Sequence, residues 1–194
     1  MSRRFAAGLL LLALGCATRI STQIAEVEPP PTIRKLVVLP FASDPAPGGS
    51  VESDAAALVA ARVLEAMTQA TSFEVVPPEE AARVGTAESP ATGKALREQF
   101  GIDAVLTGVV RRYIERIGGP SGSSRPASVW FSLELRSPDD VLLWSGTYLE
   151  NQKPLSEDLG SFRRAWQRGF RFVTAADLAS YGARELVRAM AAEI

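Results

Sequence analysis

The chain contains no histidine and a single cysteine, Cys16, among its 194 residues. Without histidine, an imidazole base cannot activate a serine or cysteine nucleophile, and the most common zinc ligand is missing. One cysteine also excludes an intrachain disulfide. These absences argue against most hydrolases and zinc proteins, and we expect neither a metal nor another cofactor.

The chain also lacks an excess of either charge. Its 21 basic and 22 acidic residues leave a formal net charge of -1, so neither a nucleic-acid binder nor a strongly acidic tail is indicated. What is present is an ordinary globular composition, 46% hydrophobic and 22% charged, in a chain long enough for one well-buried core. A single folded domain is the expected organisation.

The amino terminus has the order of a secretory signal. Arg3 and Arg4 precede an apolar run over residues 5–14, and Gly15 and Cys16 follow this run. The run falls well below the roughly 20 apolar residues that a membrane-spanning helix needs. We therefore expect residues 1–15 to be a signal peptide and not a transmembrane anchor.

Residues 12–16 have the sequence LALGC, which resembles the bacterial lipobox. The resemblance implies that the Cys16 thiol receives diacylglycerol and that the mature lipoprotein begins at this residue, anchored by palmitate or similar acyl chains. Because Ala17 follows the cysteine where an aspartate would retain the protein in the inner membrane, it also implies the periplasmic face of the outer membrane. A secreted or soluble periplasmic protein cut after Ala17 is the alternative, and a twin-arginine signal is a lesser one.

Residues 16–33 comprise the lipidated cysteine and a polar segment that ends in three consecutive prolines. This composition favours an extended polyproline tether over packed structure. At about 3.3 Å per residue at most, such a tether holds the folded domain within roughly 50 Å of the lipid. Residues 34–194 then form the single periplasmic domain.

The first half of this domain predicts an α/β fold of the mixed α+β kind. A branched apolar run over residues 34–41 is typical of a strand buried on both faces. A helix over residues 50–70, with Ser50 as its cap, and a short strand over residues 73–76 follow. Together these elements predict a βαβ unit with parallel strands and a right-handed crossover.

The second half predicts the rest of a mixed sheet. A helix over residues 92–100 leads into three strands, which cover residues 102–117, 129–136 and 141–149. The glycine- and serine-rich residues 118–124 indicate a flexible loop between the first two. Short connections make these strands an antiparallel meander, with the helices packed on the sheet.

Two carboxyl-terminal helices complete the predicted fold. Residues 156–171 place an apolar stripe opposite a basic side, and Thr174 with Asp177 has the capping-box spacing that opens a last helix. The sequence does not determine the register of the hairpin. Whether Trp130 or Trp144 faces the core therefore stays open.

The basic side of residues 156–171 is the candidate partner-binding surface, because arginine and tryptophan are enriched at interface hot spots. Its members are Arg163, Arg164, Trp166, Arg168 and Arg171. A solvated helix face with the tryptophan turned inward is the competing interpretation.

Carboxylates offer the remaining route to catalysis. Adjacent pairs occur at Glu79 with Glu80, Asp139 with Asp140 and Glu157 with Asp158. Each pair lies near a predicted helix start or in a turn, where a negative charge has a structural role. Asp103, at the entry to a buried strand, is the more interesting single carboxylate, but a polar strand-entry residue is the favoured interpretation. We predict that the protein is not an enzyme.

Three segments together resemble a recurring module of the bacterial envelope. They are KLVVLPF at residues 35–41, SFEVVPPEE at residues 72–80 and ALREQFGIDAVLTGVVRRY at residues 95–113. The module occurs in the curli-secretion lipoprotein CsgG, the penicillin-binding-protein activator LpoB and the amino-terminal domain of TolB. The resemblance covers about residues 34–148 and implies a mixed sheet with helices packed on it and a non-enzymatic role in envelope assembly or export.

The leading expectation is a non-enzymatic periplasmic lipoprotein that binds a protein partner in envelope assembly or export. One alternative is a subunit of a homo-oligomeric, curli-like secretion assembly, although no pair of long alternating segments stands outside the predicted core to build a pore. A second is an activator of a peptidoglycan synthase, which the brief tether disfavours. A carboxylate-dependent envelope hydrolase is the third.

Overall fold

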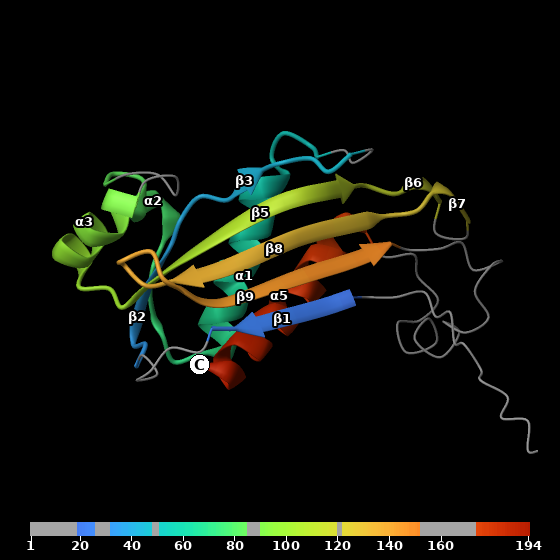
Figure 1. Cartoon of the computed structure of the whole chain (residues 1–194). Helices are drawn as coiled ribbons and strands as arrows, with labels where there is room; N and C mark the ends of the chain where they lie inside the picture. Colours follow the sequence, from blue (N-terminus) through green and yellow to red (C-terminus); the bar gives the residue numbers. More distant parts are fainter. Residues whose placement is uncertain (1–18, 26–31, 48–50, 85–89, 120–121, 152–173) are drawn as a thin grey trace, which may run out of the picture.

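A computed structural model gives the fold and describes residues 19–25, 32–47, 51–84, 90–119, 122–151 and 174–194. Figure 1 shows one open, twisted sheet that faces the viewer, with two long helices behind it. The mixed α/β fold predicted from the sequence is confirmed, because parallel and antiparallel strands share this sheet.

The predicted βαβ unit consists of β2 (Lys35–Val38), α1 (Ala55–Ala70) and β4 (Glu74–Val76), and its two strands are parallel. The helix begins later than expected. Its N-cap is Asp54 and not Ser50, because the N–H of Leu58 donates to the Asp54 carbonyl as the first helical hydrogen bond, whereas Ala55 N–H closes a tighter turn onto Glu52.

The sheet contains seven strands in the order β1-β9-β8-β5-β2-β4, with β3 paired beside β5. The remaining strands are β1 (Arg19–Ile24), β3 (Ala42–Ser43), β5 (Ala104–Ile114), β8 (Ser128–Arg136) and β9 (Leu142–Asn151). Strand β5 pairs in parallel with β2 and antiparallel with β8, and β8 and β9 form the predicted antiparallel hairpin. The sheet is not closed, since β1 and β4 are its two ends.

The prediction of an unpaired tether is wrong for Arg19–Ile24. These six residues form strand β1, which pairs antiparallel with β9 over its full length. The polar composition suggested exposed chain, but an edge strand with one solvated side tolerates polar residues, and Ile20 and Ile24 opposite Tyr148 and Trp144 give it apolar contacts with the sheet.

The glycine- and serine-rich segment after β5 is also not a plain loop. It contains a second, two-stranded sheet of β6 (Ile117–Gly119) and β7 (Gly122–Arg125), which are antiparallel. Gly118 has a φ of 134°, a backbone conformation that residues with a side chain rarely adopt. The hairpin therefore requires a glycine at this position. The hairpin extends from the far end of β5 and β8 (Figure 1).

The main core lies between the sheet and the helices α1 and α5 (Ala175–Glu193), which pack against each other on one face. Trp144, Tyr148 and Phe131 are its largest fully buried side chains. The register places Leu135 opposite Trp144 and Phe131 opposite Tyr148. This answers the question left open by the sequence, since Trp144 faces the core and Trp130 faces the other side.

A smaller core lies on the opposite face of the sheet at its β4 end. Helices α2 (Pro78–Ala81) and α3 (Pro90–Phe100) pack there on β2, β4 and the start of β5. The buried residues of this cluster are Val37, Leu39, Val76, Ala81, Leu96, Ile102 and Val105. Helix α3 ends at Phe100, as predicted, and Gly101 after it has a φ of 66°, the left-handed conformation of a helix-terminating glycine.

Helix α5 is the predicted last helix, and it begins with a complete capping box. Thr174 Oγ1 accepts a hydrogen bond from Asp177 N–H at 3.1 Å, and Asp177 Oδ2 accepts one from Thr174 N–H at 3.0 Å. The other predicted carboxyl-terminal helix, over residues 156–171, lies outside the described residues. Within the described ranges, no helix has the length and apolar character of a membrane span.

Replacement of Thr174 by alanine is expected to lower the free energy of unfolding by about 1 kcal/mol. The substitution removes the hydroxyl that accepts a hydrogen bond from Asp177 N–H and donates one to Asp177 Oδ2. Urea denaturation followed by circular dichroism measures the change. Thr174→Ser, which retains the hydroxyl, is the matched control and should cost a few tenths of that value. An equal loss in both variants would contradict a capping role.

Candidate interaction surface

The two faces of the sheet are covered unequally. Helices α1 and α5 cover one face from β1 to β2, whereas α2 and α3 cover the other face only at its β4 end. No helix of the described residues packs over the rest of this second face, which Figure 1 shows toward the viewer. We call this area the open face. Its residues are Thr107, Val109, Arg111, Arg112, Trp130, Ser132, Glu134, Ser145, Thr147, Leu149, Arg19, Ser21 and Gln23.

Strand pairing arranges the open face in rows that run across the sheet. The central row contains Val109, Ser132, Thr147 and Ser21. It consists mainly of short hydroxyl side chains, and none of them is buried. One neighbouring row contains Arg112, Trp130, Leu149 and Arg19, and the other contains Thr107, Glu134, Ser145 and Gln23. The result is a flat, hydrogen-bonding strip between larger side chains.

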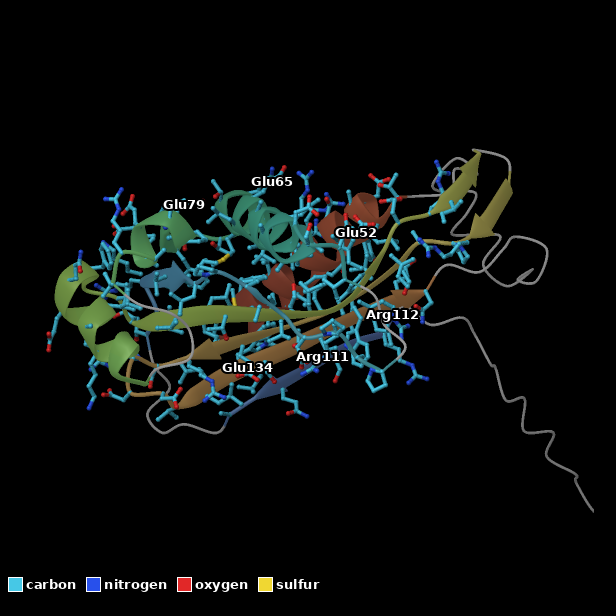
Figure 2. All side chains as sticks on the ribbon, turned by 90° about the horizontal axis from the view of Figure 1, so that it is seen from above. Glu52, Glu65, Glu79, Arg111, Arg112 and Glu134 are labelled. Atoms are coloured by element: carbon cyan, nitrogen blue, oxygen red, sulfur yellow. The ribbon has the colours of Figure 1, made fainter. Side chains whose placement is uncertain are left out.

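Two arginines flank Trp130 because β5 carries an irregularity. The register of β5 against β8 shifts between Val110 and Arg112, so that Arg111 is an extra residue and both guanidinium groups reach the same ring. Each guanidinium carbon lies 5.9 Å from the Trp130 ring centroid, within the range of a cation-π interaction. Figure 2 shows the two arginines side by side on this part of the sheet.

The two arginines differ in their other contacts. Arg111 Nη1 forms a 2.8 Å ion pair with Asp44 Oδ2, and Arg112 Nη1 donates to Asn151 Oδ1 at 3.3 Å. The Nε of Arg112 is buried and has no hydrogen-bond partner among the residues that the structure describes.

At the other border of the strip, one arginine forms ion pairs with two carboxylates. Arg136 donates from Nε and Nη2 to Glu134 Oε2 at 3.0 and 2.9 Å, and Arg136 Nη1 lies 3.3 Å from Asp140 Oδ1. The hydrogen bond that Arg136 donates to Glu134 raises the pKa of Arg136, which keeps the guanidinium charged. This cluster therefore holds the side chains at this edge of the open face in place.

The candidate carboxylates have structural roles where the structure describes them. Glu79 and Glu80 lie in the first turn of α2, and Asp140, with a φ of 66°, lies in the β8–β9 turn. Asp103 Oδ2 accepts the backbone N–H groups of Arg34 and Lys35 at 2.9 and 3.0 Å, which joins the start of β5 to the start of β2. The strand-entry interpretation of Asp103 agrees with these contacts.

Asp103→Ala is expected to destabilise the protein by about 1 kcal/mol, because two backbone donors lose a charged acceptor that water replaces only in part. Asp103→Asn retains an oxygen acceptor and should recover about half of the loss. Thermal unfolding of both variants measures the difference. If neither variant changed the stability, the contact between the two strand starts would have no energetic role.

Tyr113 is a buried acid with a strongly raised pKa. Burial raises its pKa to about 12, and the negative charges of Glu115, Glu52 and Asp54 add to the shift while Arg62 opposes it. Because the folded state keeps the phenol neutral while the unfolded chain ionises near pH 10, stability is full below pH 10 and falls as the pH rises toward 12. Tyr113→Phe should show a shallower decline over this interval, which denaturation at a series of pH values tests.

The residues singled out for anchoring and partner binding lie outside the described residues. They are Cys16, Arg163, Arg164, Trp166, Arg168 and Arg171. The open face was not predicted, although Arg111 and Arg112 interrupt the alternation of an otherwise apolar strand, which is a signal of a bulge. In the part of the chain that is described, no group of three histidine, cysteine, aspartate or glutamate side chains is placed to hold a metal ion.

Comparisons with known proteins identify a shared fold. No family model matches the sequence, and a comparison with curated proteins gives no significant match. Among solved structures, the PelC dodecamer from Paraburkholderia phytofirmans is 13% identical, with a TM-score of 0.58 over 90% of this chain and 98% of that chain. A PelC variant from the same organism, also a dodecamer and in another crystal form, is 14% identical, with a TM-score of 0.58 over 91% of this chain and 99% of that chain.

The LpoB carboxyl-terminal domain from Salmonella enterica is more distant, at 12% identity and a TM-score of 0.42 over 61% of this chain and 83% of that domain. This weaker similarity supports no conclusion. The two PelC structures show that the present chain has the fold of a protein that crystallises as a dodecamer, and at this identity the similarity is one of fold alone.

Proposed function

We propose that the chain is a lipid-anchored, non-enzymatic binding protein of the bacterial envelope, held at Cys16 to the periplasmic face of the outer membrane. The open face carries the binding role, because it combines unburied hydroxyl groups with a tryptophan and two arginines, the residue types enriched in interface hot spots. The lipobox at residues 12–16 supports the anchor. The structural roles of the described carboxylates favour the absence of catalysis.

The position of β1 sets the distance between anchor and domain in this proposal. Only residues 17 and 18 separate Cys16 from Arg19, the first residue of the sheet. At about 3.3 to 3.6 Å per residue, the sheet edge lies within roughly 11 Å of the lipidated cysteine. A domain held so close works beside the membrane surface, and this further disfavours a synthase activator that must reach far across the periplasm.

In-cell photo-crosslinking tests the binding role. A photoreactive amino acid at position 132, in the centre of the open face, should give adducts with another envelope protein. The matched control is position 65, because Glu65 is exposed on α1 at the other side of the sheet (Figure 2). Adducts at position 65 only would contradict the open face as the contact, and a peptidoglycan synthase in the adduct would favour the activator alternative.

The basic side of residues 156–171 stays a predicted contact and is tested separately. Arg164→Glu together with Arg168→Glu should reduce the same adducts if this surface contributes. Unchanged adducts would exclude this surface as a contact.

Purified protein should also show no turnover of muropeptides or glycans. An activity that is lost in Glu79→Gln would favour the hydrolase alternative.

The second candidate function is a subunit of a homo-oligomeric assembly for export. It is supported by the fold shared with PelC, which forms a dodecamer. Light scattering of the detergent-extracted, full-length protein should then give a mass of several subunits. A strictly monomeric extract would count against this candidate without affecting the binding proposal.

A further inference from the structure

Strand β1 is an edge strand without the usual protection against further pairing. It pairs with β9 on one side, and no strand of the described residues pairs with its other side. Natural edge strands are commonly protected by proline, lysine, a bulge or very short length. Strand β1 contains no proline or lysine, its one charged residue is Arg19 at its first position, and its six consecutive residue pairs with β9 show no register shift.

The backbone of β1 presents hydrogen-bonding groups to this free edge. Ala25 N–H donates to the Leu143 carbonyl at 3.1 Å, so the pair next to the strand end is a hydrogen-bonded one. Because such pairs alternate in an antiparallel ladder, Ser21 and Gln23 also bond toward β9. The N–H and C=O groups of Ile20, Thr22 and Ile24 therefore point outward.

The same edge exposes apolar side chains. Ile20 is 41% exposed and Ile24 is 54% exposed, and the register places both on the face that carries α5. The carboxyl-terminal Ile194, 36% exposed, belongs to the same region, because its neighbour Glu193 accepts hydrogen bonds from Thr22 and Trp144. Figure 1 shows the carboxyl terminus beside the end of β1. Among the described residues, three of the five exposed large hydrophobic side chains thus gather at one edge.

We infer that β1 pairs antiparallel with β1 of a second copy of this chain, with Thr22 at the centre. The two isoleucines lie at equal distances on either side of Thr22, so the apolar pattern reads the same in both directions. In this register Ile20 of each copy lies opposite Ile24 of the other. The outward backbone groups of both isoleucines and of Thr22 meet as hydrogen-bonded pairs, and no side chain other than those of β1 is needed.

This self-complementarity favours a second copy over a different protein as the occupant of the edge, because a two-fold contact requires the same patch on both subunits. The axis is perpendicular to the sheet, so the helical layers of both copies lie on one side and both open faces lie on the other. The inference rests on the homo-oligomeric candidate function and names its interface. It does not depend on the binding of a different envelope protein.

Cysteine pairing tests both the register and the direction of the strands. In the proposed register Ser21 lies opposite Gln23 of the other copy as a non-hydrogen-bonded pair, with Cα atoms about 4.5 Å apart, which is within the range for a disulfide. Full-length chains with Ser21→Cys or Gln23→Cys, differently tagged, are produced together in one cell. Oxidation should link the two tags, whereas either variant alone and the parent chain should give little linked dimer.

A second pair of variants tests the hydrogen bonds. Thr22→Pro and Thr22→Val both lose the hydroxyl that donates to Glu193 Oε1, but only proline removes the outward N–H. That N–H does not belong to the ladder with β9, so the sheet itself should fold in both variants. In detergent extracts, Thr22→Pro should weaken self-association at least about tenfold, because each copy loses a central donor, and Thr22→Val should weaken it less than about threefold.

The outcomes of these experiments distinguish a failure of the proposed β1 pairing from a failure of the homo-oligomeric candidate function. A multimeric extract in which Ser21→Cys and Gln23→Cys do not link, or in which Ser21→Cys alone links as strongly, would overturn the proposed pairing and leave the homo-oligomeric candidate standing. A monomeric extract would overturn both. Equal association of the two Thr22 variants would also contradict the pairing.

Discussion

Trp144→Ala is expected to lower the free energy of unfolding by about 3 to 5 kcal/mol, one of the largest effects of a single substitution in this chain. The indole is fully buried between β9 and α5, and its removal leaves a cavity that the surrounding sheet and helix fill only in part. The Nε1–H also donates to Glu193 Oε2 at 2.7 Å, so the substitution removes a charge-assisted hydrogen bond. Urea denaturation of the purified domain measures the loss.

Trp130→Ala is the matched control, because Trp130 lies on the other strand of the same hairpin and on the open face. The substitution removes two contacts with arginines, of about 0.5 to 1 kcal/mol each, and the partial burial of the ring. We therefore expect a loss of unfolding free energy well below that of Trp144→Ala. Similar losses for both variants would contradict the assignment of the two tryptophans to opposite faces.

Gly182→Ala is expected to destabilise the protein by about 1 to 3 kcal/mol, although alanine is the better helix former by about 1 kcal/mol. Gly182 lies in α5 where the helix approaches β9 closely. A Cβ there would lie 2.5 to 2.7 Å from ring atoms of Tyr148, which is fully buried and donates a 2.6 Å hydrogen bond to Glu150. The ring has no free direction in which to move, so the overlap outweighs the gain in helix propensity.

A double-mutant cycle checks this explanation. In a Tyr148→Ala background the obstructing ring is absent, and Gly182→Ala should become neutral or stabilising because only the helix propensity remains. Circular dichroism during thermal unfolding of the four proteins gives the coupling free energy. If Gly182→Ala destabilised both backgrounds equally, the contact between α5 and Tyr148 would not be the cause.

The prediction of strands and helices from the sequence succeeds where the periodicity is strong. The alternation of Val129, Phe131, Leu133 and Leu135 predicts β8 and its buried face, and all four are fully or almost fully buried. The apolar face of α1 and the capping box of α5 are likewise local signals. These features follow from side-chain spacing alone, because a strand or helix presents one face to the core wherever it lies in the fold.

The prediction fails where pairing partners decide the structure. Arg19–Ile24 has too little apolar content to indicate a strand, and it forms one because β9 offers a free edge along which all six residues pair. The open face depends on which part of the sheet the helices leave uncovered, and the grouping of Arg111 and Arg112 around Trp130 depends on the pairing of β5 with β8. None of these facts is local in sequence.

The sequence by itself therefore determined the class of fold, most of its elements and, through the lipobox, an expected attachment at Cys16, because each is encoded within a short window of residues. Only the tertiary structure decided which tryptophan is buried, how close the sheet lies to the predicted anchor and which surface and edge remain available for contacts. Those properties arise from strand order and helix placement, which join residues far apart in the chain and which no local pattern specifies.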